Sequence, residues 1–148
     1  MKTLAVLLFA ISSSAFAQIR LREPPPYQLT EIKVVPFSQT TNSFRAAIKK
    51  DFSGWNSLNI SLLVTVEVSG NGGTYASHRN VEIVAYEGRH VITRRVGSIG
   101  VLDESTGKYY VPLWLYGPFC QPVTIKARLT GQRQTSTLKR IVDFACGE

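Results

Sequence analysis

Hydrophobic and polar residues alternate most regularly over residues 58–68. Every even position of this stretch is apolar, from Leu58 to Val68, and every odd position is polar except Leu63. A period of two is typical of a β-strand that turns one face to a core and the other to solvent. The pattern therefore predicts a long strand here, ended by the Ser-Gly-Asn-Gly-Gly sequence of residues 69–73.

Other stretches rich in β-branched and aromatic residues are bounded by turn residues and predict further strands. Residues 97–107 are rich in Gly, Ser, Asp and Thr, as loops are. No stretch carries a sustained helical repeat with capping residues, although residues 43–50 fit either two helical turns or a strand. The further strands expected are residues 29–37, 80–87, 90–96 and 109–116, and the two legs of a hairpin that turns near Gly131. The first of these is expected near a sheet edge, because it contains Pro36.

About seven short strands separated by turns predict an all-β fold, an antiparallel β-sandwich. An immunoglobulin-like or fibronectin type III-like sandwich is the natural candidate, although the Cys-Trp-Cys spacing of true immunoglobulin domains is absent. No internal repeat or second domain boundary is visible. We therefore expect a single sandwich domain over residues 29–148.

The first 17 residues have the features of a secretory signal peptide. Lys2 precedes an apolar run over residues 4–11, and an Ala-Phe-Ala cleavage pattern ends before Gln18. The apolar run is far shorter than the roughly 20 residues that a membrane-spanning helix needs. We therefore expect residues 1–17 to be removed and the mature protein to be secreted, into the periplasm or outside the cell, without a membrane span.

Residues 18–28 are expected to form an extended leader between the signal peptide and the domain. They contain Pro24, Pro25 and Pro26 in succession. Proline fixes φ and lacks a backbone donor, so this stretch cannot be a helix.

Cys120 and Cys146 are the two cysteines, and they flank the closing hairpin. An even pair in an exported protein most often forms a disulfide. A redox role is disfavoured because the chain has no C-x-x-C motif. Pairing these two residues in an antiparallel register sets Lys126 opposite Arg140, which is unfavourable because both are cations.

The apolar residues of the hairpin favour a different register. A single β-bulge between the turn and the cysteines would reconcile this register with the one that the cysteines require. In the apolar register Val123 meets Phe144, Ile125 meets Val142 and Leu129 meets Leu138.

Tyr110, Trp114 and Tyr116 share one face of the strand expected over residues 109–116. Flat rings stack on sugars, and Tyr and Trp are favoured at interfaces, so an exposed aromatic row would form a platform for a protein or a glycan. Alternatively, the rings are buried under the N-terminal segment or an adjacent loop. Pro112 favours a position near a sheet edge, where a partner has access.

The chain has a formal charge of +7 at pH 7, and several cations lie in the closing hairpin. They are candidates for a basic binding surface; otherwise they solvate an outer face and protect an edge strand from aggregation. A nucleic-acid partner is not expected, because no recognition motif is present and the protein is exported. The set comprises Lys126, Arg128, Arg133, Lys139 and Arg140.

No pattern of residues predicts catalysis, a metal site or a cofactor. The two histidines, His78 and His90, lie in different segments, which disfavours zinc. The Val-Gly-Ser-Ile-Gly sequence around Ser98 is not the nucleophile elbow of hydrolases. Carboxylates from distant segments could still assemble a glycosidase pair.

These observations favour an exported, non-enzymatic binding or adhesion module that recognises a protein or a glycan at a cell surface or in the periplasm. The first alternative is a structural or assembly subunit of an envelope or surface complex, and the second is a hydrolase that acts on envelope polymers. An exposed aromatic row would support the binding module. A long unpaired edge strand would support the subunit, and a cleft with two facing carboxylates would support the hydrolase.

Overall fold

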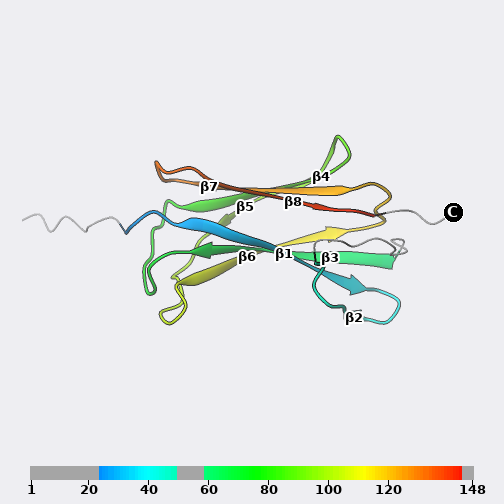
Figure 1. Cartoon of the computed structure of the whole chain (residues 1–148), viewed down its shortest axis with the longest axis horizontal. Coiled ribbons are helices and arrows are strands. Elements are labelled where there is room, and N and C mark those ends of the chain that lie inside the picture. The colour runs from blue at the N-terminus through cyan, green and yellow to red at the C-terminus, as the bar shows by residue number, and fades with distance from the viewer. Residues whose placement is uncertain (1–23, 50–58, 145–148) are drawn as a thin grey trace, which may run out of the picture.

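The computed structural model describes residues 24–49 and 59–144, which form a sandwich of two antiparallel β-sheets (Figure 1). The predicted all-β antiparallel sandwich is therefore confirmed, and the described residues contain no helix. Whether the sandwich is of the immunoglobulin or the fibronectin type III kind stays a prediction. The expected signal peptide, residues 1–17, lies outside the described residues, as does the start of the leader.

Each sheet has four strands, and the chain crosses between the sheets after β3, after β5 and after β6. The first sheet has the order β2-β1-β3-β6, and the second has the order β5-β4-β7-β8. The strands are β1 (Gln28–Ser38), β2 (Ser43–Phe44), β3 (Ile60–Ser69), β4 (Asn80–Glu87), β5 (His90–Ser98), β6 (Lys108–Tyr116), β7 (Val123–Thr130) and β8 (Ser136–Val142).

The segment after β1 is extended and does not form helical turns. β2 pairs with the end of β1, and beyond it the amides of Arg45 and Ile48 donate to the carbonyls of Pro36 and Val34, at 2.8 Å each. β1 therefore has neighbours on both sides and is not the edge strand that we expected. Pro36 fits in the interior because it takes part through its carbonyl, which needs no amide proton.

The core follows the alternation predicted for residues 58–68. Leu62, Val64 and Val66 of β3 are fully buried between the sheets. Alternation thus decides which face of each strand enters the core and which is left for other contacts. The second sheet supplies the facing core residues from β4 and β7: Val81, Ile83, Ala85, Val123, Ile125 and Ala127.

The closing hairpin adopts a register that neither sequence argument predicted. Both expected registers are wrong over β7 and β8, and no bulge interrupts the paired residues. Lys126 faces Lys139, one residue away from the expected partner Arg140. On the core side the pairs are Val123 with Val142, Ile125 with Arg140, Ala127 with Leu138 and Leu129 with Ser136.

Arg140 gives the physical reason for this difference. It lies opposite the buried Ile125, on the core-facing side of β8, and its guanidinium donates hydrogen bonds to the carbonyls of Ile32 and Ile48. Hydrogen bonds from a charged donor are stronger than those between neutral groups. The register expected from the apolar residues of the hairpin takes no account of this hydrogen bond from Arg140 to the first sheet, and it is therefore wrong.

The described end of the leader is held against the sandwich by Arg79. This arginine is only 2% exposed, and its guanidinium donates to the carbonyls of Pro24 and Pro25 at 2.6 Å each. It also lies 4.4 Å from the ring centroid of Tyr27, which is fully buried. Gln132 in the hairpin loop holds the backbone of the same tyrosine, accepting from its amide and donating to its carbonyl at 2.9 Å each.

Cys120 lies in the loop between β6 and β7 and is exposed to solvent. Its amide and that of Gln121 donate to Oε1 of Glu87, at 2.7 and 3.2 Å. Cys146 lies outside the described residues, so the disulfide between the two cysteines stays a prediction.

Candidate functional site

The outer face of the first sheet carries the three aromatic residues singled out from the sequence. The aliphatic residues of β6 enter the core, so the residues between them point away from it. Tyr110 is 53% exposed, Trp114 is 38% exposed and Tyr116 is 70% exposed. β6 is the last strand of its sheet, as Pro112 predicts, and solvent therefore reaches these rings from the side as well as from above.

Trp114 and Tyr116 form a flat stacked pair. Their ring centroids are 6.5 Å apart and their planes differ by only 16°. They are two positions apart on β6, so both rings rise from the same face of the strand. The pair presents an aromatic surface that the described part of the chain covers only in part.

Two further rings, which the sequence analysis did not connect with this site, extend the stacked pair across the sheet. Phe44 of β2 lies 6.0 Å from Trp114 between ring centroids, and Phe37 of β1 lies 6.3 Å from it with the planes at 86°. The two phenylalanines also contact each other at 5.1 Å. We refer to Phe37, Phe44, Trp114 and Tyr116 together as the aromatic ledge.

A small hollow of about 240 Å³ adjoins the aromatic ledge. Three of the ledge rings line it, together with Gln39 and Ser61. The amide Nε2 of Gln39 donates to the hydroxyl of Ser61 at 3.1 Å, so polar groups are fixed beside the rings. An apolar surface with a few oriented polar groups is the usual composition of a ligand-binding site.

Tyr110 does not belong to the aromatic ledge, although it shares the face. It stands four residues from Trp114 along β6, about 13 Å at the rise of a β-strand, and its hydroxyl bonds to the carboxylate of Glu67. This bond raises the pKa of Tyr110, because loss of the phenolic proton would set two negative charges together. The structure therefore divides the predicted row into an aromatic end and a polar end.

Glu67 is the centre of the polar end. Its Oε1 accepts from the hydroxyl of Thr30 at 2.7 Å and pairs with Nζ of Lys108 at 2.9 Å. The hydrogen bond from Lys108 is the main cause that holds the pKa of Glu67 below its ordinary value, although burial opposes it. Glu31 lies directly opposite Glu67 in the β1–β3 register, so two carboxylates do face each other on this sheet.

The cations proposed as a basic surface fall into three separate places. Lys126, Arg128 and Lys139 share the outer face of the second sheet. Arg133 lies in the hairpin loop, beside Pro24, Pro25 and Pro26. Arg140 points to the other side of β8 and bonds to the first sheet, so it is not part of an outer basic surface.

Within residues 24–49 and 59–144, no three His, Cys, Asp or Glu side chains are grouped so that they could hold a metal ion. The same residues contain no helix long and apolar enough to cross a membrane. No protein-family model matches this chain, and no curated protein matches it with significant similarity.

Proposed function

We propose that the protein is an exported, non-enzymatic binding or adhesion module that captures a glycan or a protein on its aromatic ledge. The observation that carries this proposal is the stacked pair of Trp114 and Tyr116 on the solvent face of an outer strand. Folding does not require a 70% exposed tyrosine beside a 38% exposed tryptophan. Exposed aromatic groups of this kind mark surfaces that are covered by a partner.

The geometry of the aromatic ledge favours a partner with flat apolar faces. The ring planes of Trp114 and Tyr116 are nearly parallel, and so their exposed surfaces can contact a ring of an oligosaccharide or a flat segment of a protein. Gln39 and Ser61 stand at the edge of the hollow and can exchange hydrogen bonds with hydroxyl or amide groups of that partner. Two apolar rings and two polar side chains together provide both affinity and orientation.

A test of this proposal is an NMR titration of the ¹⁵N-labelled mature protein with a panel of neutral oligosaccharides. Binding at the aromatic ledge shifts the amide signals of β2 and β6 and the indole signal of Trp114, and leaves the signals of β5 unchanged. Shifts confined to other strands would show that the aromatic ledge is not the binding surface.

The subunit alternative has its own support in the outer strand β5. Val91 and Val96 of this strand are 58% and 62% exposed, and β5 has a neighbour only on the β4 side. An unpaired strand edge with exposed apolar side chains is a template for pairing with another chain. Light scattering over a range of protein concentrations distinguishes the two functions, because a subunit assembles with itself or with a partner strand, and a binding module stays monomeric.

The electrostatics of Glu67 weigh against a role for this residue as the acid of a hydrolase. A glycosidase needs one carboxyl group that keeps its proton near neutral pH, and therefore a raised pKa. The pKa of Glu67 is lowered, because Lys108 and Thr30 stabilise its charged form. This carboxylate instead holds the side chains of Thr30 and Lys108 in place at the polar end of the sheet.

Export and the disulfide are parts of the same proposal. Mass spectrometry of the protein from the secreted fraction is expected to show an N-terminus at Gln18 and a mass lower by two hydrogens than that of the reduced chain. An intact Met1 would contradict export, and two thiols that alkylate without reduction would contradict the Cys120–Cys146 bond.

A further inference from the structure

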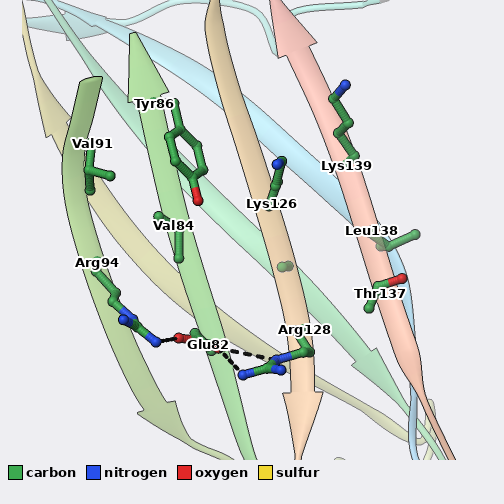
Figure 2. A pocket seen from close by; sticks show the side chains of 11 residues that line it. Glu82, Val84, Tyr86, Val91, Arg94, Lys126, Arg128, Thr137, Leu138 and Lys139 are labelled. Atoms are coloured by element: carbon green, nitrogen blue, oxygen red, sulfur yellow. Dashed lines mark hydrogen bonds and ion pairs between the residues drawn. The ribbon is translucent and has the colours of Figure 1, made fainter. Parts of the chain in front are cut away.

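The outer face of the second sheet lies on the opposite side of the sandwich from the aromatic ledge. It contains a groove that is larger than the hollow beside the ledge. The groove has a volume of about 690 Å³, which is within the range of ligand sites. All four strands of the sheet contribute to it, and Figure 2 shows the residues that line it. We call this the basic groove, with charged residues Glu82, Arg94, Lys126, Arg128 and Lys139.

The single carboxylate among the described lining residues is already neutralised. Oε1 of Glu82 pairs with Arg94, and Oε2 accepts from Nη2 and Nε of Arg128 at 2.7 and 3.2 Å. Figure 2 shows the two arginines reaching this carboxylate from either side. Their hydrogen bonds, that of Arg128 first, hold the pKa of Glu82 below its ordinary value. One ionised acid therefore stands among four cations, and the groove keeps an excess of positive charge.

Lys126 and Lys139 carry this excess at the other end of the groove. They are directly opposite each other in the β7–β8 register, and both are exposed. Like charges in this position repel, and neither lysine pairs with a carboxylate in the described part of the chain. The Nζ of Lys126 instead lies 5.1 Å from the ring centroid of Tyr86. An anion placed between the two ammonium groups would relieve their repulsion.

The floor of the basic groove is apolar. Val84, Tyr86 and Val91 line it, on the same face of the sheet as the cations. Lys126 and Arg128 are two positions apart on β7, which is about 7 Å along a strand. A ligand that fills the groove therefore needs an apolar body and more than one anionic group, spaced along its length.

We propose that the basic groove binds an anionic polysaccharide, whose sugar rings lie on the Val84 and Tyr86 floor and whose sulfate, phosphate or carboxylate groups contact Lys126, Lys139 and the two arginines. Sugar rings supply apolar C–H faces, and acidic substituents on successive units supply the repeated charge. This site is independent of the aromatic ledge, since the two lie on different sheets and share no residue.

The test compares dextran sulfate with unmodified dextran, which is the same polymer without the charge. Isothermal titration calorimetry of the mature protein is expected to show binding of dextran sulfate alone, weakened by added salt because exposed charges are screened. The double variant Lys126→Ala with Lys139→Ala is expected to lose about tenfold in affinity. Both residues are exposed, so the variant should fold, which its circular dichroism spectrum verifies.

The matched control is Lys33→Ala with Lys49→Ala, which removes the same charge from exposed positions outside the groove. It should change the affinity by less than about twofold. Equal losses in the two double variants would overturn the site, because they would show that net charge alone binds the polymer. Binding of poly-glutamate, or of phosphatidylglycerol vesicles, as tight as that of dextran sulfate would overturn the assignment to a polysaccharide.

Discussion

Trp114 and Tyr116 stack with their planes 16° apart on the solvent side of the outer strand β6. Phe37 of β1 and Phe44 of β2 support the tryptophan from across β3, so the stacked pair is held in place before any partner arrives. A preorganised surface loses less conformational entropy on binding than a mobile one. The aromatic ledge is therefore suited to recognition and contributes little to the core.

The two stacked rings should differ in their contribution to stability. Tyr116→Ala is expected to lower the free energy of unfolding by less than about 1 kcal/mol, because the side chain is 70% exposed. Trp114→Ala is expected to cost about 1–2 kcal/mol, because its ring contacts three others. Denaturant unfolding measures both. Leu62→Ala in the core is the reference and should cost about 2–5 kcal/mol; a loss of that size for Tyr116→Ala would show that the ring is a core element.

Arg79 should be essential for holding the leader. Arg79→Ala is expected to destabilise the fold by about 2–4 kcal/mol, since it breaks a buried hydrogen-bond network with the carbonyls of Pro24 and Pro25. Arg79→Lys should recover only part of this, because an ammonium group cannot reproduce the guanidinium fork. Limited proteolysis should cut both variants near the leader faster than the native protein. Arg133→Ala, an exposed neighbour, is the control, and an equal effect there would contradict the assignment to Arg79.

The predicted disulfide has a measurable cost of removal. It closes a loop of roughly 26 residues, and so Cys120→Ser with Cys146→Ser should lower the free energy of unfolding by about 3–4 kcal/mol in the chain-entropy model. The residues of the aromatic ledge should keep their NMR chemical shifts in this variant. An unchanged melting temperature would mean that no such bond constrains the fold.

Asp103 should make the stability of the β5–β6 loop depend on pH. Its Oδ1 accepts from the hydroxyls and amides of Ser105 and Thr106, and these bonds lower the pKa of Asp103 from 3.8 to about 2. Because the pKa is lower in the folded state, the ionised carboxylate stabilises the protein at pH values above its ordinary pKa. This contribution is lost as the pH falls from 3.8 towards 2.

Asp103→Asn tests this directly through thermal unfolding at several pH values. The variant should be less stable than the native protein at pH 6, and the difference should shrink as the pH falls to 2. Glu104→Gln is the matched control on the adjacent exposed residue. A difference that stays constant across the whole range would show that the charge of Asp103 does not stabilise the loop.

Alternation along single strands was the part of the structure that could be predicted from the sequence. A period of two places Leu62 in the core and separates Trp114 and Tyr116 from the aliphatic side of β6, because successive side chains of any strand point to opposite faces. These properties depend only on local geometry.

The contacts between strands could not be predicted in the same way. Phe37 and Phe44 reach Trp114 because β2, β1, β3 and β6 are neighbours in that order, which is a property of the whole fold. The hairpin register depends on Arg140, whose hydrogen bonds end on the first sheet about a hundred residues earlier in the chain. A pattern read within one hairpin contains no information about such partners.

The most direct test of the proposed function compares how tightly the native protein and two variants, each lacking one exposed tyrosine, bind a partner. An array of neutral glycans, and affinity capture from the surface and secreted proteins of the cells that produce the chain, would be probed with the native protein, Tyr116→Ala and Tyr75→Ala. Tyr75 is 55% exposed and lies outside the aromatic ledge, so it controls for the loss of an exposed ring. We expect a glycan or protein bound by the native form to be held about tenfold more weakly by Tyr116→Ala and equally well by Tyr75→Ala. Equal binding by all three forms, or no binding by the native protein in either experiment, would contradict the proposal.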